Sequence, residues 1–308
     1  MNDTSSSEIK REFMKSRSGL VGIGILACLI IMSIVAVITI PIDTFKQWNN
    51  PGNWISYPKA SIPIWVNYFI AEKIPEHTII KNPEIITKDG IISLTSQQFM
   101  LDYDYSDFPD GLIYEFDTEY SGSILLHISV IRPDQTEMLL LSTSLPYSDT
   151  KTQHHERIFT TDNNIKKNLE FQSANLDANE NTKSSEMLIF SDANGEVLNG
   201  RYLFLVNFYG MNQQLEILDS KLIVGGKAFG LMGTDELRRD LMVGLLWGTP
   251  LALFIGIVVA IGSVTIGLLY GVYAGFKGKK TDESMMRFND IIYALPALPF
   301  LIILAVTI

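Results

Sequence analysis

The 308-residue sequence has little cysteine and lacks the spacings that mark metal sites. Its one cysteine, Cys28, cannot form an internal disulfide, so the chain must be held together by packing. The four histidines have no cysteine or histidine partner at zinc-finger or metalloprotease spacing: His77, His127, His154 and His155. The adjacent pair His154 and His155 is typical of a surface turn. We therefore predict no metal site.

Motifs for nucleotide binding and hydrolysis are also missing. The segment 275–281 contains glycine and lysine but not the Gly-Lys-Ser/Thr ending of a phosphate-binding loop. No Gly-x-Ser-x-Gly nucleophile elbow occurs. We therefore predict that the chain is not an enzyme and has no catalytic residue and no cofactor. If ATP drives its activity, the hydrolysis is expected on a separate subunit.

Three long apolar runs lie at the two ends of the chain. Residues 19–40 carry no charged side chain, and at about 1.5 Å rise per residue such a run crosses a hydrocarbon core roughly 30 Å thick. The alternative, a cleavable signal peptide, has a shorter apolar core. A second charge-free run covers 241–276, where Pro250 suits the first turn of a helix and leaves 241–249 as an interfacial lead-in. A third run starts near Ile291, so three membrane spans are predicted.

The charges predict how these spans are oriented. The net charge is −10, but between Pro41 and Asp240 there are 28 acidic against 16 basic residues, a balance of −12. Basic residues gather instead before the first run and between the second and third, at 277–287. The positive-inside rule then places the amino terminus and 277–287 in the cytoplasm and the long acidic segment outside. The predicted location is the plasma membrane, with several spans and a large extracytoplasmic loop.

The long external segment divides by composition. Residues 41–74 are rich in tryptophan, tyrosine and proline, which favours a position along the outer membrane face, with a soluble-domain core as the alternative. Residues 75–225 alternate β-type runs with turn signals, which predicts an inserted all-β, sandwich-like domain. The expected strands are 112–118, 123–131, 137–143, 187–190, 201–208 and 215–224. The polar stretch 163–185 is predicted to be a long loop. Residues 1–40 then form the tail and first span, and 226–308 begin a helical core.

Glycine recurs every four residues in the second apolar run, at Gly267, Gly271 and Gly275. This spacing places three positions without Cβ on one face of a helix, where another membrane helix can approach closely. The alternative is the general abundance of glycine in membrane helices. We predict that the three glycines form a helix-packing face.

An ordered series of residues around the second run resembles a known family. Gly233-Thr-Asp-Glu-Leu-Arg-Arg-Asp240 is similar to the Gly-Thr-Asp-x-x-Gly-Arg-Asp signature of C-subunit permeases in dipeptide and oligopeptide ABC importers. The sequence Tyr270–Phe276 and the segment 282–297 match the same family in order, as does 15–22 at the start. The matching family positions are Gly233, Thr234, Asp235, Arg239 and Asp240. Arg238 stands where the family usually has glycine.

The resemblance implies a six-span subunit that imports peptides or a related small solute by alternating access. It also implies its partners, which are a second permease, two ATPase subunits, an extracytoplasmic solute-binding protein and the lipid bilayer, with no nucleic acid. Because three of six spans are present, the chain is expected to be truncated at its carboxyl end. The alternative hypothesis is a membrane-anchored binding or sensory receptor whose external domain carries the function.

Overall fold

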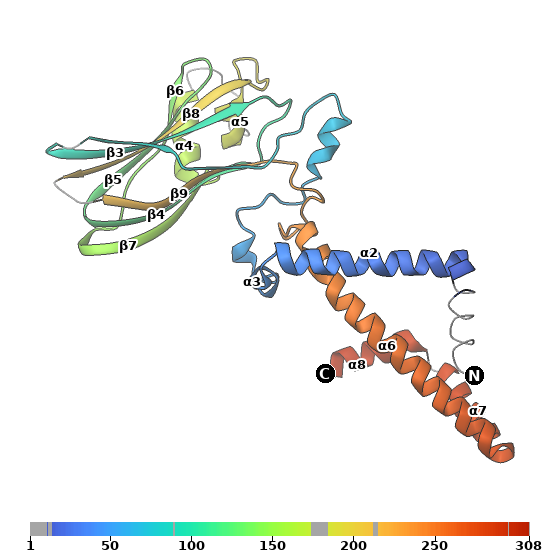
Figure 1. Ribbon diagram of the computed structural model, residues 1–308. Helices are drawn as coiled ribbons and strands as arrows, with labels where there is room; N and C mark the ends of the chain where they lie inside the picture. The colour runs from blue at the N-terminus through green and yellow to red at the C-terminus, as the bar shows by residue number, and fades with distance from the viewer. Residues whose placement is uncertain are drawn as a thin grey trace. The chain divides into compact units, whose positions relative to one another are not determined.

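A computed structural model describes residues 11, 14–88, 90–173, 184–211, 215–294 and 296–307 as two compact units (Figure 1). One unit comprises Met1–Ala36 with Leu246–Ile308 and is helical. The other unit, Val37–Leu245, contains two β-sheets. Each unit is described by itself below.

The helical unit carries the long apolar runs. Two helices, α2 (Arg17–Thr39) and α6 (Leu241–Lys277), are long and apolar enough to cross a membrane. The helices α7 (Lys279–Ala294) and α8 (Ala297–Thr307) are bent by 76° to one another and supply a third crossing only if the pair forms one span. The described chain therefore has two or three candidate spans, where the sequence predicted three.

The sequence predicts that the second spanning helix starts at Pro250, and this prediction is wrong. The helix α6 begins at Leu241 and continues through Pro250 without a break. The amide nitrogens of the first helical turn need no partner within the helix, so proline is tolerated best there. Here the proline lies deeper, and the first residues of α6 are instead fixed by a side-chain cap, described below. The predicted lead-in 241–249 is thus the first part of the helix.

The β-unit is a sandwich of two antiparallel sheets (Figure 1). One sheet has the order β1-β9-β4-β7 and the other β2-β3-β8-β5-β6. The strands are β1 (Thr78–Lys81), β2 (Glu84–Lys88), β3 (Ile92–Tyr103), β4 (Gly111–Gly122), β5 (Ile124–Ile131), β6 (Glu137–Ser144), β7 (Ser148–Phe159), β8 (Gly200–Met211) and β9 (Leu215–Gly225). The first strand pairs with the last, Thr78 opposite Val224. The points at which the chain enters and leaves the sandwich therefore lie side by side.

The core between the sheets is aromatic and aliphatic, with one polar bridge. Phe99, Phe116 and Phe208 are among its fully buried side chains. The bridge starts at Gln97 of β3, whose amide donates to Ser220 Oγ at 2.9 Å and accepts from Tyr114 Oη at 2.6 Å. Both partners belong to the opposite sheet. A buried polar group is tolerated when it is hydrogen-bonded, so this bridge fixes how the sheets face one another.

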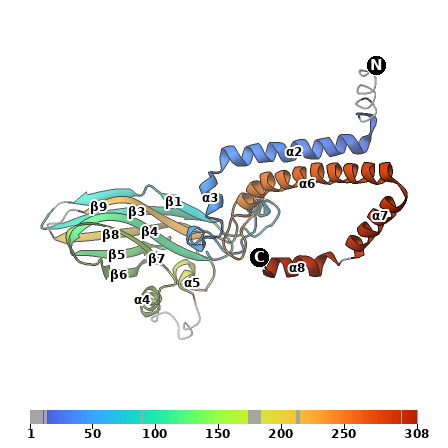
Figure 2. The ribbon, with the colours of Figure 1, turned by 90° about the horizontal axis from the view of Figure 1, so that it is seen from below.

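Two helices close one edge of the sandwich, which corrects the all-β prediction. The helix α4 (Asn163–Ser173) lies where a loop was predicted and buries Leu169 in the core, and residues 174–183 of that predicted loop lie outside the described residues. The helix α5 (Ser185–Phe190) replaces the predicted strand 187–190 and is capped by the Ser184 hydroxyl, which accepts from the amide of Met187 at 3.3 Å. Figure 2 shows both helices beside β6 and β7.

The aromatic segment 41–74 contains only short helices: α3 (Ile42–Lys46), η1 (Pro51–Asn53) and η2 (Ile64–Tyr68). It runs beside the end of the β-unit, where the amide of Ile62 donates to the carbonyl oxygen of Lys227 at 2.9 Å. Trp54 is buried, whereas Tyr68 is exposed. The segment therefore has an inner part, which packs within the unit, and an outer part, which faces away from it.

Candidate functional site

The family-like residues form one compact turn, Gly233–Asp240, called the motif turn below. Thr234 and Asp240 form an antiparallel bridge, and the amide of Asp235 donates to the carbonyl oxygen of Arg239 at 3.1 Å. The amide of Leu241, the first residue of α6, donates to the carbonyl oxygen of Gly233 at 3.1 Å. The turn is thus closed on itself and is bonded directly to the start of the long apolar helix.

Asp235 organises the inside of this turn. Its carboxylate accepts from the amides of Leu237 and Arg239, each at 2.9 Å, and from Arg239 Nε at 2.7 Å. Burial alone would raise the pKa of Asp235, but the hydrogen bonds from Arg239 and from the two amides outweigh it and lower the pKa. The carboxylate therefore stays ionised at neutral pH and serves as the fixed centre of the turn.

Asp240 and Arg239 connect the turn to the helix and to an aromatic side chain. Asp240 Oδ1 accepts from the amide of Met242 at 2.8 Å and so caps the first turn of α6. Burial raises the pKa of Asp240, and the amides of Met242 and Val243 act against that rise. The guanidinium of Arg239 lies 4.9 Å from the ring centre of Trp48, a cation–π contact.

Gly233 and Thr234 lock the turn onto residues 57–62, the facing segment. The Thr234 hydroxyl is buried, donates to the carbonyl oxygen of Pro58 at 2.7 Å and accepts from the amide of Ser61 at 3.0 Å. A Cβ at Gly233 would lie 2.1 Å from the carbonyl oxygen of Ser61, and the residue has a φ of +75°. Only glycine fits that combination of close approach and left-handed backbone.

Arg238 adopts a backbone conformation that is typical of glycine. Its φ is +66°, in the left-handed region that disfavours most side chains. Its Nη1 donates to the carbonyl oxygen of Tyr57 at 2.7 Å, a contact with the facing segment that glycine cannot make. At this position the chain therefore combines a left-handed backbone with an added side-chain contact to the facing segment.

Aromatic rings continue from the motif turn into the β-unit. Trp48 packs on Trp54 with ring centres 5.4 Å apart, and Trp54 packs on Tyr57 at 5.3 Å. Tyr57 in turn contacts Phe229 at 5.2 Å and stacks on His77 at 6.2 Å. We call these five residues the aromatic cluster. The cluster links the facing segment, through Tyr57, to His77 just before β1 and to Phe229 just after β9.

His77 is the unusual member of this cluster. Both ring nitrogens are buried, and neither has a hydrogen-bond partner among the residues that the structure describes. Burial lowers the pKa of His77 from 6.5 to about 4, and the positive charge of Arg238 acts in the same direction. Beside it lies a cavity of about 120 Å³, which Tyr57, Arg238 and Thr160 also line. No local sequence pattern predicts this site, because its members are far apart in the chain.

The other residues singled out in the sequence do not join this site. His154 and His155 lie on strand β7 rather than in a turn, and each contacts one carboxylate, Glu156 and Asp117 respectively. Within the described ranges there is no group of three histidine, cysteine, aspartate or glutamate residues that could hold a metal ion.

The glycine strip on α6 is uncovered in the structure. A Cβ at Gly267, Gly271 or Gly275 would meet no atom within 4 Å among the described residues. No helix of the described chain therefore occupies this face, and its role in helix packing stays a prediction.

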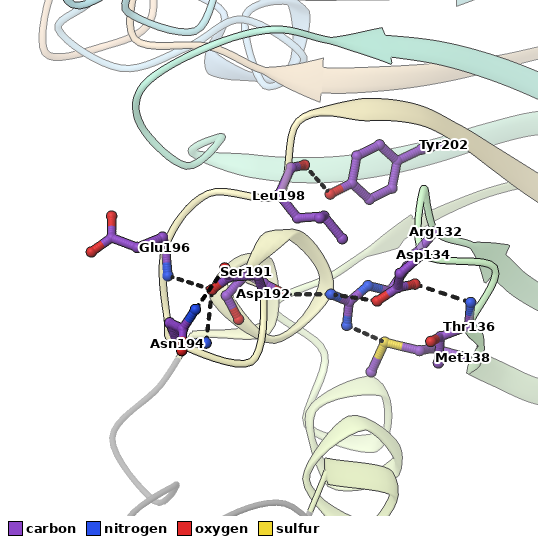
Figure 3. Close-up of polar contacts among 10 residues, drawn as sticks. All are labelled: Arg132, Asp134, Thr136, Met138, Ser191, Asp192, Asn194, Glu196, Leu198 and Tyr202. Atoms are coloured by element: carbon purple, nitrogen blue, oxygen red, sulfur yellow. Dashed lines mark hydrogen bonds and ion pairs between the residues drawn. The ribbon is translucent and has the colours of Figure 1, made fainter.

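A second polar cluster, shown in Figure 3, joins the turn after β5 to the loop after α5. The guanidinium of Arg132 donates to the carbonyl oxygen of Ser191 and lies 3.3 Å from a carboxylate oxygen of Asp134. In the loop, Asp192 Oδ1 accepts from the amides of Asn194 and Glu196 at 2.8 and 2.9 Å. These contacts tie two turns together, so we interpret the cluster as structural.

Comparison with known proteins finds similarity over part of the chain. No protein-family model matches. The oligopeptide transport system permease protein OppC of Bacillus subtilis is 43% identical over 74 residues, which are 24% of this chain and 24% of that protein. The dipeptide transport system permease protein DppC of the same organism is 42% identical over 74 residues, 24% and 23% of the two chains. OppC of Haemophilus influenzae is 43% identical over 78 residues, 25% of each chain.

The chain thus spans about a quarter of the length of the curated relatives that it matches. Solved structures are less similar. A structure of the Gx strain of infectious bursal disease virus covers 50% of this chain and 32% of its own, at 9% identity and a TM-score of 0.29. The carbohydrate-binding module TmCBM61 covers 54% and 95%, at 9% identity and a TM-score of 0.21. These values are too low to indicate a shared fold or function.

Proposed function

We propose that this chain is a permease subunit of an ABC importer and forms half of the path for peptides or a related small solute. The observation that carries the proposal is the identity of 42–43% over 74 residues with permease proteins of peptide transport systems. Two or three apolar helices agree with a membrane location. ATP hydrolysis belongs to separate subunits in this proposal, as expected for a permease.

The motif turn supports the proposal through its construction. Its internal bonds and its cap on α6 fix the first residues of a candidate spanning helix. A permease that alternates between two states needs helices that move as defined bodies, because interfaces and packed cores change in discrete steps. The proposed assembly contains a second permease, two ATPase subunits and an extracytoplasmic solute-binding protein. In it the amino terminus lies in the cytoplasm and Pro41–Asp240 lie outside.

Peptide uptake in the source organism tests the proposal. Deletion of the gene is expected to abolish ATP-dependent uptake of labelled di-, tri- or oligopeptides, and the intact gene supplied in trans should restore it. Uptake of a free amino acid serves as the control and should not change. Unchanged peptide uptake in the deletion strain would contradict the proposal. If a peptide-induced signalling response is lost while uptake is retained, the receptor alternative is correct instead.

A further inference from the structure

An exposed apolar patch lies next to the motif turn. It consists of Trp65, Tyr68 and Phe69, in and after η2, and of Leu231 and Met232, just before the turn. Their side chains are 48%, 83%, 82%, 65% and 40% exposed, in that order. Apolar residues scattered singly on a surface need no explanation, whereas contiguous groups mark sites of interaction. We call these five residues the aromatic patch.

Direct contacts join three of the five residues. Trp65 Nε1 donates to the carbonyl oxygen of Leu231 at 3.0 Å, and the ring centres of Trp65 and Phe69 are 6.2 Å apart. Tyr68 follows Trp65 by three residues in a 3₁₀-helix, and that spacing places both side chains on one side. None of the five side chains is charged. The patch is therefore built from two segments that are far apart in the sequence and are bonded through Trp65 and Leu231.

The patch is also fixed next to the start of α6. Met232 directly precedes Gly233, whose carbonyl oxygen accepts from the amide of Leu241, the first residue of that helix. If α6 crosses a bilayer, its first residues lie at the level of the lipid headgroups, and the hydrogen bond from Leu241 to Gly233 holds the end of the patch beside them. Tryptophan and tyrosine are enriched at that level, because their rings are apolar while one end of each can form hydrogen bonds.

From this geometry we propose that the aromatic patch is a lipid-contact surface, seated at the headgroup level of the bilayer. The inner aromatic residues Trp48 and Trp54 take no part, because they pack within the β-unit. A partner protein is the competing occupant, but the bonded neighbour of this patch is the start of a candidate membrane span. The proposal rests on α6 crossing a membrane, which is one part of the proposed function, and does not depend on the transported solute.

The full chain with Cys28→Ser, reconstituted in lipid nanodiscs, provides the test. An environment-sensitive fluorophore is attached at Tyr68→Cys or, as a control, at Ala193→Cys in an exposed loop of the β-unit. Phospholipids with a doxyl quencher near the headgroup are expected to quench position 68 several-fold more than a quencher deep in the acyl chain. Position 193 should remain unquenched. Because only lipid is added, this result is independent of any transport measurement.

Charge substitution within the patch sharpens the test. Phe69→Glu is expected to reduce quenching at position 68 several-fold, because a carboxylate disfavours the interface. Phe171→Glu is the matched control, since Phe171 is 83% exposed on α4, and it should leave the quenching unchanged. Circular dichroism of each variant checks that the sheets are intact. Equal quenching at positions 68 and 193, or shielding of position 68 only after a second permease subunit is added, would overturn the proposal.

Discussion

Acidification should lower the folding stability of the β-unit through His77 in a defined pH range. The unfolded chain carries this histidine with a pKa near 6.5, whereas burial lowers the pKa to about 4 in the folded protein. The unfolded state therefore binds the proton more tightly than the folded state. Stability is complete above pH 6.5, falls as the pH decreases from 6.5 toward 4, and loses nothing further from this group below that.

The size of the effect follows from the two pKa values. The gap between 6.5 and about 4 corresponds to about 3.4 kcal/mol of unfolding free energy when it is fully crossed. At pH 5.5 the loss from His77 alone is about 1.4 kcal/mol. Other groups also titrate in acid, among them Asp235, whose lowered pKa adds a loss of stability at lower pH. A comparison with a variant is therefore needed to isolate His77.

The variant His77→Leu removes the titration and leaves no donor or acceptor unpaired, because neither ring nitrogen has a partner among the described residues. The full chain and the variant are unfolded in detergent with denaturant at pH 7.5 and 5.5. Fluorescence reports the transition, since Trp48 and Trp54 lie in the aromatic cluster. The parent should lose about 1.4 kcal/mol more than the variant between the two pH values. Equal losses would refute the reasoning, and the burial of a neutral histidine would then have no energetic consequence.

Three further predictions concern the turn, the core and the topology. Gly233→Ala should destabilise the β-unit by at least about 1 kcal/mol because of its positive φ, and the clash with the facing segment should add to this loss. Arg238→Ala should lower the unfolding free energy by about 1 kcal/mol more than Arg238→Gly, because φ is positive there too. Denaturant midpoints measure both effects. Gln97→Leu should lower the unfolding free energy by about 2 kcal/mol or more, because it leaves the buried hydroxyls of Tyr114 and Ser220 without their partner. Adding Tyr114→Phe to the same chain should recover part of that loss. In a cysteine-free background, a membrane-impermeant maleimide should label Ala193→Cys from outside intact cells and Lys280→Cys only after permeabilisation, and reversed labelling would contradict the proposed topology.

The sequence predicts strands of the β-unit well where apolar and polar residues alternate. It does not predict strands whose burial depends on residues that are distant in the sequence. The strands β4, β5, β6, β8 and β9 were expected close to their observed positions. The strand β3 was missed because polar residues interrupt it, and one of these, Gln97, is buried only because the opposite sheet supplies its partners. The edge strand β7 was missed because most of its side chains are exposed and polar.

The short apolar segment 187–190 is predicted to be a strand but is a helix, for a related reason. The six residues of α5 are as compatible with a strand as with a helix, and the cap from Ser184 decides between them. The candidate site also contains residues that the sequence identifies and residues that it does not. Resemblance identified the residues of the motif turn, but the partners Pro58, Ser61 and His77 precede the turn by more than 150 positions. No local pattern in the sequence connects them.

The way in which the β-unit closes explains how a large unit can stand between two candidate spans. Strand β1 pairs with β9, and Ile62 and Glu76 both form bridges with Ala228. The chain therefore enters and leaves the unit along adjacent backbone segments, and the motif turn is bonded to the facing segment on the incoming side. The entropy cost of closing a loop rises only slowly with its length, and here bonds between the two ends hold the loop closed. Because the closing bonds lie within the unit, the size of the sandwich can vary without changing the turn that caps α6. A β-unit of this size between two candidate spans is for this reason compatible with the proposed function.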